Sequence, residues 1–424
     1  MRKRKKKRKN KRGFIFIIFI FIIIAVLLFI FLGSKNDKEV KDKEVVSNVM
    51  IKLNSVEDAQ NFVKDKDIKL IINYEYSDTV EKDKIISQSV KSGDKLDNIK
   101  EIEIVVSLGK LDKEKLASDK INELGAVPIM MYHGIINKPS SETGNTGGNV
   151  DKDGYNRTSE AFREDLEFYY QNNYRMIRLQ DYIDGNIDTE YGKSPIILTF
   201  DDGNDNNLKV TGLDDKGNII IDENSAVGIL ESFKKKYPDY KVTATFFVNG
   251  TLFNQEEYDE KILKWLVDNG YDVGNHTETH IDIKKSSAEK VQSEIGSVYD
   301  KLEEIIPNKY VKIIALPFGS PYSKDHANYQ YVLKSDYNGK TYETEAALRV
   351  GWEAELSPFN KDFDKTFLKR IRAYDNNGVD FDIKMNFDIL EKKRYISDGN
   401  VKTIVTSSDN ESIIGNNDLE KIYY

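Results

Sequence analysis

The chain has 424 residues, of which 39% are hydrophobic, and 63 basic and 71 acidic side chains give it a net charge of −8. This length allows two or three globular domains. The absence of cysteine excludes disulfides, cysteine metal ligands, a thiol nucleophile and a lipidated-cysteine anchor. Ten of the first twelve residues are Lys or Arg, so the rest of the chain carries −18, and we expect no nucleic-acid partner for it.

The basic residues 1–12 are followed by an unbroken apolar run from Phe14 to Leu32. About twenty helical residues span the ~30 Å hydrocarbon core of a membrane. The run is longer than a signal-peptide core, and no small-x-small cleavage site follows it. We therefore expect residues 13–33 to be an uncleaved transmembrane helix, with the basic tail in the cytoplasm and everything after Ser34 outside the cell.

Residues 34–46 are charged and are expected to be a flexible spacer. A small α+β module is predicted after them, over residues 47–109. It starts with a helix that Ser55 caps. Three strand-like runs follow it, at residues 68–74, 84–90 and 102–108.

The segment from Ser77 to Gly109 resembles a PASTA domain, a module that binds cell-wall peptidoglycan in other proteins. The usual opening Pro-x-Val-x-Gly is missing from this chain. We therefore expect the module either to bind glycan or to serve as a spacer that holds the rest of the protein off the membrane.

Residues 110–126 are predicted to be a linker to a larger α/β domain at residues 127–424. In that domain, Ile136 to Tyr155 is rich in Gly, Ser and Asn and predicts a loop, and Phe162 to Tyr170 has helical apolar spacing. Val210 to Asp222, with Asp-Lys-Gly-Asn at its middle, predicts an inserted hairpin.

The apolar run from Pro195 to Phe200 reads as a buried strand that ends at Asp201-Asp202-Gly203. Neighbouring side chains on a strand point to opposite faces. One of the two carboxylates can therefore bind a metal ion while the other acts as a general base. Asp-Gly is also a common turn signal, so the motif alone could simply end a strand.

His276 and His280, two of only four histidines, follow a second strand-like segment, Tyr271 to Gly274. Two histidines and one carboxylate make three ligands, which leaves an open position for water, as in catalytic metal sites. Such a set suits zinc, cobalt or ferrous iron. Functional residues at the ends of successive strands are typical of parallel α/β barrels, although an i, i+4 histidine pair can also be a polar surface.

The chain from Val127 onward resembles the polysaccharide deacetylases of carbohydrate esterase family 4. The resemblance is carried by Thr-Phe-Asp-Asp-Gly, His-Thr-x-x-His and three further segments, at 127–134, 244–248 and 316–319. It implies a distorted (β/α) barrel and a bound divalent metal ion, with zinc expected first and no other cofactor. It also implies that Asp201 is the catalytic base, that the N–H of Phe318 binds the oxyanion, and that the metal ligands are Asp202, His276 and His280.

The chain departs from the family at two positions. Ala315 stands where many members have an arginine that orients the base, and Ile404 to Ser407 contains no histidine where Leu-x-His usually supplies the general acid. His133 could fill the gap that the missing arginine and histidine leave, or it could be a hydrogen-bonded core histidine. Arg370 or Arg372 could also fill it, although the charged run around them favours a solvated face.

Trp352 is expected to be buried in the core, with stacking on a sugar ring as the alternative.

These features predict a membrane-tethered, extracellular enzyme that removes N-acetyl groups from an amino-sugar polymer, with cell-wall peptidoglycan as the first expected substrate. A metal-activated water would attack the acetamide while the base accepts its proton. One alternative is a deacetylase of a secreted poly-N-acetylglucosamine. Another is a non-catalytic wall-binding or sensing protein that has lost turnover together with its arginine and terminal histidine.

Overall fold

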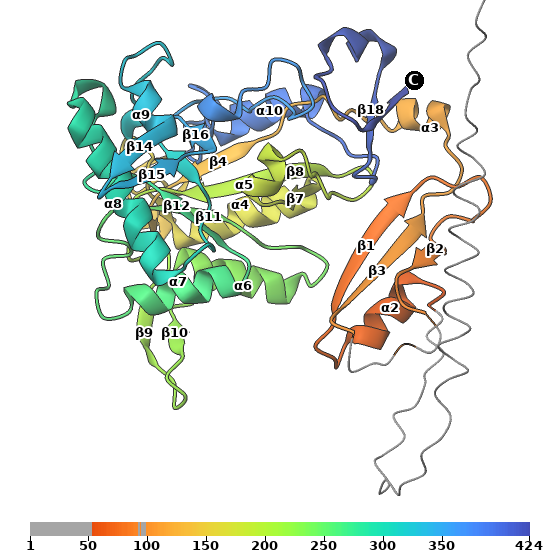
Figure 1. Ribbon diagram of the computed structural model, residues 1–424, viewed down its shortest axis with the longest axis horizontal. Coiled ribbons are helices and arrows are strands. Elements are labelled where there is room, and N and C mark those ends of the chain that lie inside the picture. The colour runs from red at the N-terminus through yellow and green to blue at the C-terminus, as the bar shows by residue number, and fades with distance from the viewer. Residues whose placement is uncertain (1–52, 92–93, 95–98) are drawn as a thin grey trace, which may run out of the picture. The chain divides into compact units, whose positions relative to one another are not determined.

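The computed structural model describes residues 53–91, 94 and 99–424 (Figure 1). The predicted basic tail, transmembrane helix and spacer lie outside the described residues. Among the residues that are described, no helix is both long and apolar enough to cross a membrane.

The small module has one helix and a three-stranded sheet. The Ser55 hydroxyl accepts a hydrogen bond from the backbone N–H of Asp58 at 3.1 Å, so the predicted cap is confirmed. The central strand pairs in parallel with one neighbour and antiparallel with the other, in the order β1-β3-β2. The elements are α2 (Val56–Val63), β1 (Lys69–Glu75), β2 (Ile85–Gln88) and β3 (Glu101–Ser107).

The larger domain is built on a curled sheet in which every paired strand is parallel. Its order is β16-β13-β12-β11-β8-β4-β17, and β7 pairs with β8. The expected α/β architecture is therefore present as an open half-barrel. The strands are β4 (Ile129–Tyr132), β7 (Tyr174–Met176), β8 (Ser194–Phe200), β11 (Thr245–Val248), β12 (Asp272–Asn275), β13 (Ile313–Ala315), β16 (Ala346–Leu348) and β17 (Ile371–Arg372).

Helices cover the outer face of this sheet (Figure 1). Most of them start at a serine, threonine or aspartate whose side chain accepts a backbone N–H, as Thr158 does for α4. The helices are α4 (Ser159–Gln171), α5 (Leu179–Ile183), α6 (Ala226–Lys236), α7 (Asp259–Asp268), α8 (Ala288–Ile305), α9 (Tyr329–Leu333) and α10 (Ile383–Lys393).

Four short strand pairs flank the main sheet. The predicted insertion after β8 is confirmed as the hairpin of β9 (Val210–Leu213) and β10 (Ile219–Ile221), which projects from the domain in Figure 1. The other pairs are β5 (Ile135–Ile136) with β6 (Arg157–Thr158), β14 (Lys334–Tyr337) with β15 (Lys340–Glu343), and β18 (Thr403–Thr406) with β19 (Glu420–Tyr423).

The predicted linker at 110–126 is not a free segment. It contains α3 (Lys113–Ser118), and Leu116 and Ile121 are buried in one cluster with residues of β18 and β19. The Glu123 carboxylate is also buried and accepts hydrogen bonds from Tyr395 and from the backbone of β18. These residues complete the core of the larger domain, so its packing begins before residue 127.

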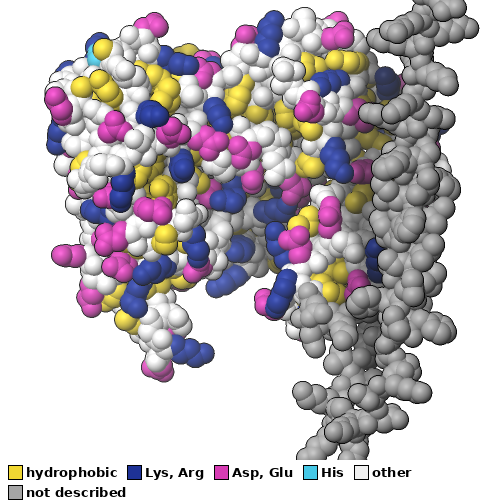
Figure 2. All heavy atoms as spheres, viewed as in Figure 1, with side chains coloured by type: hydrophobic (Ala, Val, Ile, Leu, Met, Phe, Trp, Pro, Cys, Tyr) yellow, Lys and Arg dark blue, Asp and Glu magenta, His cyan; other side chains and the backbone are white. Residues whose placement is uncertain are grey.

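Acidic and basic side chains are interspersed over the face of the molecule that Figure 2 shows. Many of them form exposed ion pairs such as Lys264–Glu260 and Lys334–Glu343. Exposed pairs of this kind contribute about 0–1 kcal/mol each to stability. The stability of the domain therefore rests on its buried core and not on surface charge.

Candidate active site

Strand alternation brings residues from separate strands to one point on the inner face of the half-barrel. Ile197 in β8 and Ile129 in β4 belong to the inner core cluster. Side chains two positions apart share a face, so Asp201 and His133, each four positions further along its chain, are expected on that face just beyond the strand ends. His276 follows β12 at the same edge of the sheet. All three line one pocket of ≈ 320 Å³.

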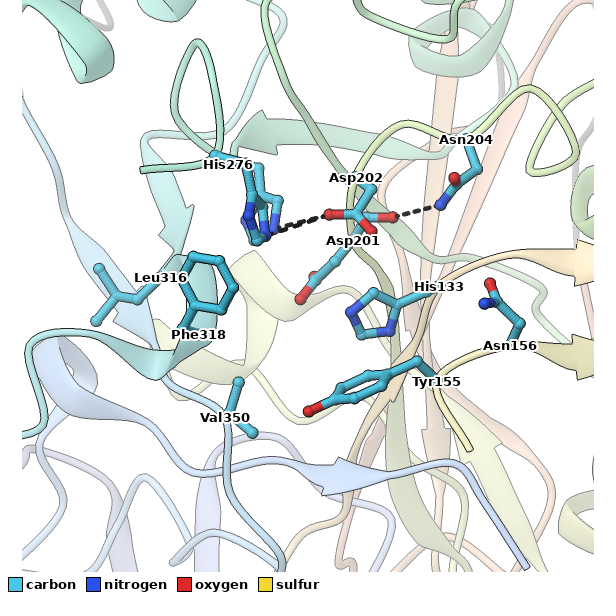
Figure 3. Close-up of a pocket in the computed structure, with 11 residues that line it drawn as sticks. His133, Tyr155, Asn156, Asp201, Asp202, Asn204, His276, Leu316, Phe318 and Val350 are labelled. Carbon is cyan, nitrogen blue, oxygen red and sulfur yellow. Dashed lines mark hydrogen bonds and ion pairs between the residues drawn. The ribbon is translucent and has the colours of Figure 1, made fainter. Parts of the chain in front are cut away.

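Asp202, His276 and His280 form a set with the geometry of metal ligands. Their ligand atoms lie within 4.8 Å of one another. The Nε2 atoms of His276 and His280 are 3.3 and 3.5 Å from Oδ1 of Asp202, contacts drawn in part in Figure 3. Two imidazoles and one carboxylate fit zinc, cobalt or ferrous iron and leave further coordination positions open.

The hydrogen bonding of His276 independently favours a metal at this place. Its Nδ1 lies 2.8 Å from the backbone carbonyl of Ala315. A carbonyl can only accept, so Nδ1 carries a proton, and in the neutral imidazole Nε2 then has a free lone pair. Nε2 is buried and has no hydrogen-bond partner among the described residues. An imidazole oriented through its other nitrogen is the usual arrangement of a metal-binding histidine.

Asp201 is paired with Arg370, one of the residues that the sequence offered to fill the gap left by the family's missing arginine and histidine. The two guanidinium nitrogens Nη1 and Nη2 each donate to one oxygen of the carboxylate at 2.7 Å. Nη1 also donates to Thr199 at 3.1 Å, and Nε donates to the carbonyl of Arg349 at 3.2 Å. The expectation that Arg370 lies on a solvated face is therefore wrong, since its side chain is 0% exposed. The sequence around Arg370 gives no sign of this pairing, because its partner Asp201 lies 169 positions earlier.

This pairing fixes the charge of Asp201. Burial acts to raise the pKa of the carboxyl, but Arg370 and then His276 outweigh it, and the pKa lies well below its ordinary value. The carboxylate is thus ionised and held in one orientation. These are the properties that a general base requires.

His133 is a half-buried histidine of this pocket that lies outside the ligand set. Figure 3 shows its ring between Asp201 and Tyr155. Neither ring nitrogen makes a hydrogen bond with the described residues, and Nδ1 is fully buried. The alternative of a hydrogen-bonded core histidine is therefore wrong. Burial lowers the pKa of the His133 imidazole.

Leu316, Phe318 and Val350 form the apolar side of the pocket (Figure 3). The Phe318 ring packs edge-on against His280 at 4.5 Å between centroids. The backbone N–H of Phe318 makes no hydrogen bond within the described part of the chain, so it is available to a ligand. Trp352, two residues after Val350, is 57% exposed, and the expectation that it belongs to the core is wrong.

Left-handed backbone recurs in this site. Asp202, Thr277, His280 and Phe318 have φ values of 77°, 64°, 55° and 58°. Residues other than glycine avoid this region, at a cost of about 1–3 kcal/mol each, and persist there where the surrounding structure holds them. Strained residues gather at functional sites, and here two of them are in the ligand set.

Sequence reasoning missed several pocket residues. Tyr155, Asn156 and Asn204 line the pocket. Tyr155 ends the predicted loop, and neither asparagine belongs to a motif that the sequence analysis uses. No residue of β18, where the family has its terminal histidine, lines the pocket. The alternation of Arg370 and Arg372 around the buried Ile371 was the available signal for a strand with an inward-facing arginine.

Two family models match the chain. Residues 188–336 match the polysaccharide deacetylase family, and residues 46–108 match the PASTA domain. The chain contains a polysaccharide deacetylase domain preceded by a PASTA domain. Both expected resemblances are thereby confirmed.

Curated relatives are similar to the chain over a part of its length. An uncharacterized 30.6 kDa protein of Geobacillus stearothermophilus is 32% identical over 127 residues, which are 30% of this chain and 39% of that protein. The peptidoglycan-N-acetylmuramic acid deacetylase PdaA of Bacillus subtilis is 30% identical over 110 residues, which are 26% of this chain and 33% of PdaA. The chain thus spans about a third of the length of these relatives.

Solved structures resemble the chain more distantly. The Streptococcus pyogenes deacetylase PplD, solved with acetate, is 19% identical with a TM-score of 0.44, over 60% of this chain and 94% of PplD. IcaB of Ammonifex degensii is 17% identical with a TM-score of 0.36, over 59% of this chain and 92% of IcaB.

Proposed function

We propose that this protein is a metal-dependent hydrolase that removes N-acetyl groups from an amino-sugar polymer. The observation that carries the proposal is the position of Asp201. Its carboxylate is held by Arg370 in the same pocket as the ligand set of Asp202, His276 and His280. The pairing also compensates for the loss of the family's arginine at Ala315, one of the two departures on which the non-catalytic alternative rests.

The residues of the pocket divide the chemistry among them. A divalent cation held by Asp202, His276 and His280 would supply Lewis acidity, which lowers the pKa of water and polarises a carbonyl. Asp201 accepts the proton of the attacking water. The N–H of Phe318 donates to the carbonyl oxygen as negative charge develops on it.

Cleavage of the C–N bond releases acetate and leaves an amine nitrogen that needs a proton. His133 is the pocket histidine that the ligand set does not use, and its ring faces the same hollow as Asp201. It is placed to pass on to that nitrogen the proton that Asp201 accepts from the water, in place of the terminal histidine that this chain lacks. General acid catalysis of this kind contributes roughly 10²- to 10⁴-fold to a rate.

The proposed substrate is cell-wall peptidoglycan, at its N-acetylglucosamine residues. Two observations support it. The PASTA domain precedes the catalytic domain, and the PdaA relative is named a peptidoglycan-N-acetylmuramic acid deacetylase, which supports the polymer and not the choice of sugar within it. The apolar run at residues 14–32 after ten basic residues supports a place outside the cell at the membrane surface.

Acetate release from defined N-acetylglucosamine oligomers and from peptidoglycan tests this function. We expect release that stops on chelation and returns on adding a divalent ion. If the metal-loaded protein releases no acetate from any of these glycans, the proposed enzymatic function is wrong. If it turns over poly-N-acetylglucosamine faster than peptidoglycan, the proposed substrate is wrong.

A further inference from the structure

A second pocket lies beside the catalytic one. It has a volume of ≈ 630 Å³, within the roughly 300–1,000 Å³ common for ligand sites. The two pockets share a wall. Tyr155 lines the catalytic pocket, and the Arg372 guanidinium of the second pocket stands 5.3 Å from the Tyr155 ring centroid.

Arg372 lines this pocket, and the N–H groups of its guanidinium have no acceptor among the described residues. It lies two positions after Arg370, so the strand directs both side chains to the same face of β17. Its guanidinium stacks over the ring of Tyr374 at 3.9 Å. It forms no ion pair or hydrogen bond with the described residues. A partly exposed, stacked arginine without a carboxylate partner has its planar N–H groups available to a ligand.

Carboxylates face the same hollow and also retain free acceptors. One oxygen of Asp375 accepts from the backbone of Asn377, and one oxygen of Asp380 accepts from the side chain of Asn376. The other oxygen of each makes no hydrogen bond with the described residues, and neither carboxylate pairs with Arg372. A ligand carrying one sign of charge would meet both signs here. A hydroxyl, which donates and accepts, satisfies both kinds of group.

We propose that the second pocket binds a neutral, hydroxyl-bearing pyranose unit of the glycan, next to the unit that the catalytic pocket deacetylates. The inference rests on the proposed function for the identity of the polymer. Arg372 is then a specificity residue. Its contribution appears only with oligomers long enough to occupy both pockets.

Arg372→Gln tests the proposal. We expect N-acetylglucosamine pentamer to bind about 10-fold more weakly to this variant than to the wild type, because the lost contacts involve a charged donor. The N-acetylglucosamine monomer cannot occupy both pockets, so we expect it to bind equally to the two proteins. Binding is measured by titration calorimetry on the full chain with chelator present, so that turnover does not consume the ligand. Equal pentamer binding by variant and wild type, or no pentamer binding by the wild type at millimolar concentration, overturns the subsite.

Arg394→Gln is the matched control. Arg394 also stacks over a tyrosine, Tyr174 at 5.1 Å, but it lies by Ala126, before the start of β4, and lines neither pocket. We expect this variant to bind the pentamer and the monomer like the wild type. A thermal unfolding midpoint of Arg372→Gln near the wild-type value separates lost contact from lost fold. Because binding is read without turnover, a protein that binds the pentamer through Arg372 but releases no acetate would refute the enzyme and leave the subsite standing.

Discussion

A single side chain, Arg370, decides whether Asp201 can act as a base. A carboxylate that is fully buried and unpaired would be protonated at neutral pH, since burial disfavours the charged form. Arg370 reverses this and keeps the pKa of Asp201 below its ordinary value. The pairing therefore stabilises the fold at pH values above the unfolded pKa of about 3.9 and loses that contribution as the pH falls toward the folded pKa.

Arg370→Gln should move the acidic limb of the pH–rate profile upward by at least about one unit, because burial then raises the pKa of Asp201 without the guanidinium to oppose it. The variant should also lose about 3–5 kcal/mol of unfolding free energy at neutral pH, the usual cost of breaking a buried pair. The measurements are kcat/KM against pH and denaturant unfolding. Arg370→Lys should restore the charge but not the two-point contact, and so should recover only part of the rate. An unshifted acidic limb in Arg370→Gln would remove Asp201 from the role of base.

Replacing metal ligands and replacing the base should give different defects. His276→Ala should lose bound metal and turnover together, because Nε2 of His276 has no other partner. Asp201→Asn should retain the metal while turnover falls by about 10²- to 10⁴-fold. Metal content per chain and acetate release are measured on the same preparations. Full metal occupancy in His276→Ala would contradict the ligand assignment.

At the scale of elements, the short parallel strands determine which parts of the site were foreseeable. The strand before Asp201 and the one before His276 are local patterns, so their existence and the residues at their ends could be predicted from the sequence. β17 is only two residues long, and Arg370 is buried through contacts with Thr199 and Asp201. No local pattern carries such distant contacts, and a run of Lys and Arg favours a surface on its own.

The turn after β8 is a second element whose geometry is tightly fixed. Gly203 has φ of 60°, and a Cβ there would lie 2.0 Å from the carbonyl oxygen of Leu252. Asp201 and Asp202 directly precede Gly203 in this turn. Glycine at 203 therefore serves the site by letting two loops approach closely.

Gly203→Ala should lower the unfolding free energy by about 2–4 kcal/mol, from the left-handed backbone and from the clash together. Gly192→Ala is the matched control. Its φ is 75°, but no atom lies within 4 Å of the added Cβ, so we expect a loss of about 1 kcal/mol. Denaturant unfolding of both variants measures the difference. Equal losses would show that the contact with Leu252 can relax freely.

At the scale of the whole molecule, the order of the parts suggests delivery of the enzyme to the wall. A predicted anchor, a spacer and a PASTA domain stand before the catalytic domain in the chain. Tethering and weak binding raise the effective concentration of an enzyme at nearby substrate. Since Leu116 and Ile121 belong to the packed core, a shortened enzyme has to begin before them.

A protein that begins at Lys110 should deacetylate short soluble oligomers as fast as one that begins at Ser34. On insoluble peptidoglycan the longer protein should be faster, because only there does the PASTA domain add binding. Initial rates of acetate release on both substrates measure this. Equal rates on the insoluble wall would show that the PASTA domain is a spacer.

The place of Arg370 bears on how active deacetylases are picked out of genomes. A filter that demands an arginine two residues before the proline of Leu316-Pro317 would discard this chain as a dead homologue, because Ala315 stands there. In the order of the sheet, β13 and β17 lie near opposite ends. Ala315 is in β13, whereas Arg370, whose guanidinium binds Asp201, directly precedes β17. An arginine side chain that pairs with the base can thus come from either end of the curled sheet. Homologues are better sorted by whether any arginine reaches both oxygens of the base than by where in the chain it is encoded.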